Sequence, residues 1–171
     1  MNPNPRRRQS PFWLFAVRCS LVAVWSLYGA WASALDSPPI EDLATFPRAS
    51  LEISAKDGTQ HFDVWVADTN ARQAQGLMFV RDLAPDAGML FVESAPRPMS
   101  MWMKNTFIPL DMLFIAADGR IVRIAARTKP HSLDSISSYE PVTMVLELRG
   151  GETKRRGIRV GDHVRVSPDK S

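Results

Sequence analysis

The chain has 171 residues, of which 45% are hydrophobic and 23% are charged, and its formal net charge is +3. This composition is typical of a one-domain globular protein, and it excludes a disordered chain, a collagen and a membrane protein with several spans. The positive charge belongs to the N-terminal segment, because residues 35–171 contain 17 Lys and Arg against 18 Asp and Glu. We therefore expect no nucleic-acid partner.

The first 34 residues have the pattern of a bacterial export signal. Arg6-Arg7-Arg8 supplies a positive start, an apolar stretch follows, and Ala32-Ser33-Ala34 supplies the small residues of a cleavage site. We expect cleavage after Ala34 and a periplasmic or secreted protein that keeps no membrane span. The alternative is an uncleaved anchor formed by residues 12–34, which are numerous enough to span a membrane.

The only cysteine, Cys19, lies within this predicted signal. The exported body would then contain no thiol, which excludes disulfides, thiolate catalysis and cysteine-ligated zinc. Residues 35–48 include Pro38, Pro39 and Pro47, and we expect them to form a flexible tether. Residues 49–168 are predicted to form a single β domain, followed by a tail at 169–171.

The first half of this domain begins with two alternating apolar runs, at 51–55 and 62–66, on either side of Asp57-Gly58. This pattern predicts a β-hairpin. Thr69 is the predicted N-cap of a short helix whose apolar residues share one face as far as Met78, with Gly76 near its end. The apolar run at 89–92 predicts a short buried strand.

The second half contains further strand patterns. We expect extended chain at 99–103, and strands at 110–116 and 121–126 around Asp118-Gly119. The polar segment 128–141 predicts a long loop, and Met144, Leu146 and Leu148 share one face of a strand at 143–148. A helical turn at 150–156 and a closing strand at 163–166 complete the domain.

These elements amount to seven or eight strands and one or two short helices, joined mainly as hairpins. The predicted fold class is mostly β (α+β), a small antiparallel or mixed β-barrel or curled sheet.

Five segments also match a known family in their order and spacing. They are Val66–Thr69, Gln75–Phe79, Gly88–Val92, Trp102–Asp111 and Gly157–Asp162. In these motifs the chain resembles the exported bacterial family named domain of unknown function 192 (DUF192). The resemblance covers residues 51–166 and implies a small, mostly β domain behind a signal peptide. It implies no activity, because the family has no established one.

The most informative segment for function is 99–111. Trp102 offers a flat apolar surface, Lys104 a cation and Asn105 an amide, and Asp111 follows close by. Together these groups are typical of a site for a small polar molecule, such as a sugar or an anion. We expect Arg81 and Tyr139 to contribute to the same site. The alternative is that these residues brace the loop structurally.

The same segment presents Met99, Met101 and Met103 on the other face of an extended chain. Three thioethers on one face of an exported protein favour a soft metal, so a Cu(I)-handling periplasmic protein is the second hypothesis. The alternative is that these methionines fill the core. No other cofactor is predicted.

A third hypothesis is a module that interacts with a protein of the cell envelope. The sequence contains no recognisable catalytic motif, and an enzyme would have to rely on acid–base chemistry of Lys104 and Asp111. Whether the protein is an enzyme is therefore left open by the sequence.

Overall fold

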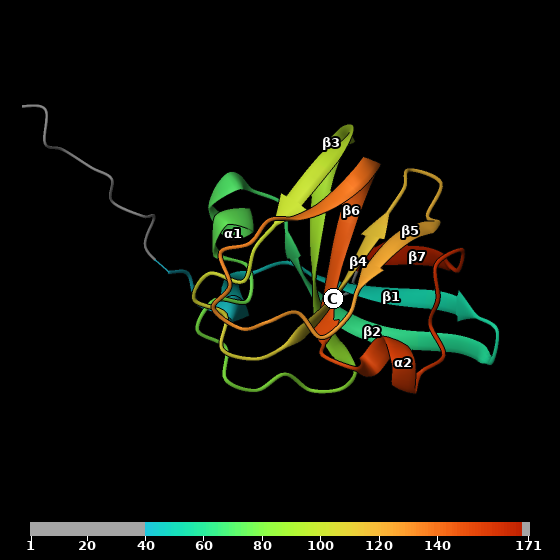
Figure 1. Cartoon of the computed structure of the whole chain (residues 1–171), viewed down its shortest axis with the longest axis horizontal. Coiled ribbons are helices and arrows are strands. Elements are labelled where there is room, and N and C mark those ends of the chain that lie inside the picture. Colours follow the sequence, from blue (N-terminus) through green and yellow to red (C-terminus); the bar gives the residue numbers. More distant parts are fainter. Residues whose placement is uncertain (1–39, 169–171) are drawn as a thin grey trace, which may run out of the picture. The chain divides into compact units, whose positions relative to one another are not determined.

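The structure is a computed structural model that describes residues 40–168, in which seven strands form one mixed, curled sheet (Figure 1). The predicted export signal (1–34) and the predicted tail (169–171) lie outside the described residues. The strands are β1 (Arg48–Ala55), β2 (Gly58–Ala67), β3 (Ala87–Met101), β4 (Leu110–Ile115), β5 (Ile121–Ala125), β6 (Ile136–Arg149) and β7 (His163–Pro168). Within this range, no helix has the length and apolar character needed to cross a membrane.

The strands follow the order β5-β4-β6-β3-β2-β1-β7 across the sheet. The pair β2 and β3 is parallel, and the other pairs are antiparallel. The two edges of the sheet approach each other, because Arg120, just before β5, forms an isolated bridge with His163 at the start of β7. The result is a half-barrel, and the predicted mostly β class with short helices is confirmed.

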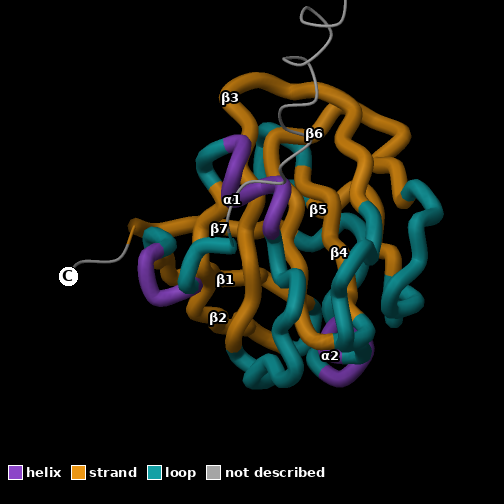
Figure 2. The backbone as a smooth tube through the Cα atoms, turned by 90° about the vertical axis from the view of Figure 1, so that its left-hand side faces the viewer, coloured by secondary structure: helices purple, strands orange, loops and turns teal. Residues whose placement is uncertain are grey.

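The two faces of the sheet carry separate apolar clusters. Neighbouring residues of a strand point to opposite faces, so Phe91 and Val145 belong to the first cluster, whereas Leu90 and Leu146 belong to the second. The first cluster also packs against the chain that follows α1 (Asn70–Gln75), through Leu77. The two views place α1 and α2 (Glu152–Arg155) at opposite ends of the half-barrel (Figure 1 and Figure 2).

Local sequence signals account for the elements in the first half of the domain. The hairpin β1–β2 turns at Lys56-Asp57, directly before Gly58, which begins β2 with a φ of 118°. Thr69 caps α1, since its Oγ1 accepts a hydrogen bond from the backbone N–H of Arg72 at 3.3 Å. The helix ends at Gly76, whose φ of 50° is one that glycine adopts at little cost.

Strand β6 begins earlier than the sequence indicated. The segment 128–141 was predicted to be a loop, but residues from Ile136 onward already pair with the far end of β3. Polar residues are tolerated there because that part of the ladder is exposed on one side, and Pro141 lies opposite Pro98, where neither residue has an N–H to donate. Register shifts at β3 accommodate the two prolines.

The described part of the predicted tether is also ordered. Residues Leu43–Thr45 form a short 3-10 helix, and Phe46 is buried in the first apolar cluster. The backbone of Glu41 exchanges two hydrogen bonds with the side-chain amide of Gln75, at 2.7 and 2.8 Å. Burial of Phe46 and this amide clamp fix a proline-containing segment that composition alone indicated to be flexible.

Candidate functional site

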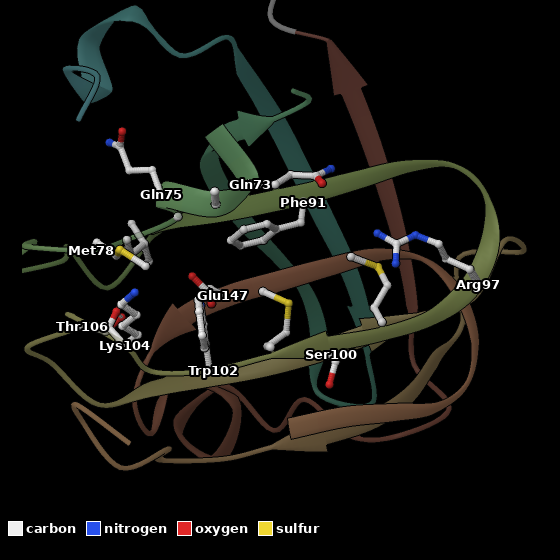
Figure 3. A pocket seen from close by; sticks show the side chains of 15 residues that line it. Gln73, Gln75, Met78, Phe91, Arg97, Ser100, Trp102, Lys104, Thr106 and Glu147 are labelled. Carbon is white, nitrogen blue, oxygen red and sulfur yellow. Dashed lines mark hydrogen bonds between the residues drawn. The ribbon is translucent and has the colours of Figure 1, made fainter. Parts of the chain in front are cut away.

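A cavity of about 130 Å³ lies between the end of α1, strand β3 and the loop that follows β3 (Figure 3). Its walls include Gly76, Met78, Phe91, Met99, Trp102 and Glu147. We call this space the Glu147 cavity, because Glu147 is the acidic side chain among its lining residues and comes from the middle of the sheet. The cavity is therefore assembled from segments that lie far apart in the sequence.

Glu147 is buried, with 4% of its surface exposed. It shares a strand face with Val145, and its ladder partners are Met89 on β3 and Met112 on β4, both fully buried. Among residues 40–168, no group donates a hydrogen bond to its carboxyl, and no cation forms an ion pair with it. Every completely inaccessible side-chain oxygen in that range has a hydrogen-bond partner. The carboxyl oxygens of Glu147 have none, so they are not completely inaccessible and retain access to the cavity.

Burial changes the protonation of this side chain. Loss of solvation raises the pKa of Glu147 from 4.5 to about 8. At pH 7 the carboxyl is therefore mostly protonated, and it can both donate and accept a hydrogen bond. An acid in a cavity whose pKa is strongly raised is a candidate functional group.

Gly76 keeps the space in front of Glu147 open. A Cβ atom at this position would lie 3.0 Å from Cζ of Phe91 and 3.9 Å from Oε2 of Glu147. A side chain would thus press on the Phe91 ring and approach the carboxyl. The glycine that ends α1 therefore also permits the backbone to approach the sheet closely at this point.

The other polar residues of the cavity are neutral (Gln73, Gln75, Ser100 and Thr106) or basic (Arg97 and Lys104), and Trp102 adds an aromatic ring. Trp102 is 48% exposed, and Nζ of Lys104 lies 5.1 Å from the centroid of its ring, a cation–π arrangement. Arg97 also borders the cavity, but its Nη2 lies 2.5 Å from Oε1 of Glu93 and is thereby neutralised. This hydrogen bond from Arg97 lowers the pKa of Glu93, against the effect of desolvation.

The structure brings some of the predicted site residues together and separates others. Trp102, Lys104, Met99 and Met101 line the Glu147 cavity. The other predicted residues do not line it; they are Arg81, Met103, Asn105, Asp111 and Tyr139.

Asp111 acts as a structural brace. Its side chain is completely buried and accepts hydrogen bonds from the backbone N–H groups of Arg127, Gly151 and Thr153, at 2.8, 2.9 and 2.9 Å. The hydroxyl of Thr153 donates a further bond at 2.6 Å. These contacts fix the start of α2 to β4, so the geometry matches the bracing alternative considered for this residue.

Asn105 and Met103 also have local partners. Asn105 has a φ of 56°, and its backbone oxygen accepts a hydrogen bond from the N–H of Phe79 at 2.9 Å, which ties the loop to the chain after α1. Its side-chain amide contacts the sulfur of Met78 at 3.9 Å. The sulfur of Met103 is buried in the core and accepts a hydrogen bond from Oγ1 of Thr128 at 3.0 Å.

Arg81 and Tyr139 belong to other surface contacts. The Arg81 guanidinium lies over the ring of Phe107, at 4.8 Å from its centroid. Tyr139 is 77% exposed, and the Arg123 guanidinium lies 4.7 Å from its ring centroid. Neither residue is directed to the Glu147 cavity.

Sequence reasoning did not identify Glu147. It placed Met144, Leu146 and Leu148 on one face of a strand and gave no role to the opposite face. That face is buried too, because β6 is central in the sheet and Val145 packs in the first apolar cluster. The available signal was a lone acidic residue within the run Met144–Leu148, since an acid is seldom buried without a partner.

Comparisons with known proteins agree with the family resemblance. The family model DUF192, described as Uncharacterized ACR, matches residues 52–166. No curated protein matches the chain.

Two crystal structures are similar to the described fold. One is a protein of Sinorhizobium meliloti 1021, provisionally described as a transcription regulator; it is 44% identical, with a TM-score of 0.69 over 71% of this chain and 95% of that one. The other is a protein of unknown function from Novosphingobium aromaticivorans DSM 12444; it is 34% identical, with a TM-score of 0.71 over 78% of this chain and 94% of that one. The family model and these identities together establish that the chain belongs to the DUF192 family.

Proposed function

We propose that this protein binds a small polar molecule in the Glu147 cavity. The observation that carries the proposal is the buried carboxyl of Glu147, which has access to the cavity but no hydrogen-bond partner among residues 40–168. Buried polar groups in folded proteins are nearly always hydrogen-bonded, because an unmade bond costs free energy. A ligand group seated in the cavity can serve as that partner in place of water.

The size and walls of the cavity restrict the ligand. A cavity of about 150 Å³ holds a molecule of the size of benzene, so the 130 Å³ of this cavity suit a ligand, or one end of a ligand, of similar size. Phe91 and Trp102 provide flat apolar surfaces, whereas Glu147 and Lys104 provide polar contacts. A few polar groups among apolar walls are typical of small-molecule sites.

The test is a ligand screen read by tryptophan fluorescence. The full chain is titrated with small amines, carboxylates and sugars, and a ligand in the cavity changes the emission of Trp102. Replacing Trp102 by Phe removes the response, whereas Trp65→Phe preserves it, because Trp65 does not line the cavity. Glu147→Gln weakens binding. The proposal fails if no compound binds. It also fails if the Trp102→Phe variant responds like the wild type and the Glu147→Gln variant binds as tightly as the wild type.

Cu(I) is a second candidate ligand, favoured by one observation. The thioether side chains of Met78, Met99 and Met101 line the cavity, and thioethers are ligands that Cu(I) prefers. The predicted metal ligands were Met99, Met101 and Met103. Met103 has its sulfur in the core, and Met78 borders the cavity in its place. A titration against a competing Cu(I) chelator, with Met78, Met99 and Met101 replaced by Leu, tests this candidate.

We further propose that the protein acts outside the cytoplasm. The support is the sequence pattern of residues 1–34, in which Arg6–Arg8 precede an apolar stretch and Ala32 and Ala34 mark a cleavage site. Expression in a bacterium followed by fractionation and N-terminal sequencing tests it. A periplasmic or secreted form that begins at Leu35 supports export with cleavage, and an intact cytoplasmic chain contradicts it.

A further inference from the structure

We infer that the Glu147 cavity selects a small organic ammonium ion, for which Glu147 serves as the buried counter-ion. The inference rests on the proposed function and names the chemical class of its ligand. It is carried by the position of a buried acid in the wall of the cavity and by the chemistry of the residues around it.

The first observation is the charge arrangement. Glu147 is the acid among the described lining residues and lies in the centre of the sheet, between Met89 and Met112. An ionised carboxylate in such surroundings requires a cation in direct contact. For the ionised form that cation would come from a ligand, because no basic residue in the described range pairs with Glu147.

The second observation is that the walls suit a positive charge. The faces of aromatic rings are negative, and Phe91 and Trp102 both border the cavity. The polarizable sulfurs of Met78 and Met99 complete an apolar lining that accommodates the alkyl part of an amine.

The third observation is the direction of α1. The lining residues Gln73, Ala74 and Gly76 belong to its last turn and its C-cap. The C-terminal end of a helix carries partial negative charge on its free carbonyl groups, which favours a cation nearby. This effect is small for a six-residue helix, but it has the same sign as that of Glu147.

An anion is less well served by the cavity. The basic groups that face it are Lys104, from the loop after β3, and Arg97, from β3 itself. Arg97 is paired with Glu93, and Lys104 lies over Trp102. An anion beside Glu147 would contact that carboxyl favourably only while it is protonated.

Binding of an ammonium ion would release a proton. Without ligand, the carboxyl of Glu147 is mostly protonated at pH 7, because burial raises its pKa to about 8. When an alkylammonium ion pairs with it, the carboxylate form is stabilised and its proton passes to the solvent. Binding should therefore strengthen as the pH rises from 6 to 8, and the ammonium ion itself keeps its charge over this interval.

The experiment is isothermal titration calorimetry of the full chain with propylammonium, 1-propanol and acetate, at pH 7 in two buffers with different ionisation enthalpies. We expect propylammonium to bind at least ten times more tightly than 1-propanol, with release of close to one proton. Glu147→Gln should reduce propylammonium affinity at least tenfold and abolish proton release. Glu152→Gln, which alters an acid outside the cavity, should change neither quantity.

Three outcomes would overturn the inference. If acetate or a sugar binds with a Trp102-dependent response and propylammonium does not, the cavity is a site for another polar class, and the proposed function stands without this refinement. If Cu(I) binds with equal affinity in wild type and Glu147→Gln while propylammonium fails to bind, the cavity is a thioether metal site. If no probe binds, the proposed function fails as well.

Discussion

Replacing Glu147 by Gln should make the protein more stable at high pH. Below pH 4.5 the carboxyl is protonated in both folded and unfolded chains, so its titration has no effect on stability. Between pH 4.5 and about 8 the unfolded chain loses this proton while the folded chain keeps it, because burial holds the pKa of Glu147 near 8. This one carboxyl therefore lowers the free energy of unfolding of the wild type by about 1.4 kcal/mol per pH unit in that interval.

Between pH 4.5 and pH 8 the ionisation of this carboxyl lowers the unfolding free energy by about 5 kcal/mol in total, and this loss stays constant above pH 8. This is a large part of the stability of an ordinary domain, which is roughly 5–15 kcal/mol. Gln has nearly the same shape and does not ionise, so the variant escapes the loss. We expect the difference in unfolding free energy, variant minus wild type, to increase by about 5 kcal/mol between pH 4 and pH 9.

The assay is urea denaturation of both proteins at several pH values. All other titrating groups are the same in the two proteins, so their contributions cancel in the difference between the two unfolding free energies. Glu152→Gln is the matched control, because Glu152 is buried but ion-paired with Arg155 and Arg156. A difference for Glu147→Gln that is constant from pH 4 to pH 9 would refute the reasoning, because it would mean that this carboxyl titrates alike in folded and unfolded chains.

Three further results are expected. Asp111→Asn should lower the free energy of unfolding by about 3 kcal/mol, since it disrupts charged hydrogen bonds to α2; urea denaturation measures this, and an unchanged midpoint would contradict the brace. Gly76→Ala should weaken ligand binding and cost about 1–3 kcal/mol, because its Cβ would meet Phe91 at 3.0 Å and the φ of 50° disfavours alanine; calorimetry and denaturation together check this, and wild-type affinity would contradict it. For Glu152, desolvation raises the pKa, but hydrogen bonds from Arg155 and Arg156 outweigh it and lower the pKa overall. The stabilisation this gives is present above the ordinary pKa of 4.5 and is lost as the pH falls through the lower folded-state pKa, so Glu152→Gln should be destabilising at pH 7 and less so in acid; an equal effect at pH 7 and pH 2 in denaturation would contradict this.

Local signals in the sequence were sufficient for much of the fold. The β1–β2 turn and the Thr69 cap depend on neighbouring residues only, and both are present as predicted. The start of β6 could not be predicted in this way, because residues from Ile136 onward are extended by pairing with β3, far away in the sequence. The order of residues 40–47 likewise depends on a distant partner, Gln75.

The candidate site was predictable only in part. Trp102 and Lys104 were found because they combine an aromatic ring with a cation in one short segment, and both border the cavity. Asp111 was grouped with them by proximity in sequence, but the strand that follows Pro109 carries it to the hydrogen-bond donors at α2. Glu147 was missed because its significance arises from burial between β3 and β4, which requires the sheet order.

The most direct test of the account is the titration of the Glu147 carboxyl itself. The ¹³C signal of this group, assigned by its disappearance in Glu147→Gln, is followed by NMR from pH 3 to pH 10 in the full chain. We expect a midpoint near 8, because the carboxyl is buried in the cavity wall and desolvation raises its pKa. A midpoint near the ordinary value of 4.5 would show a solvated or paired carboxylate and would contradict the proposed binding site.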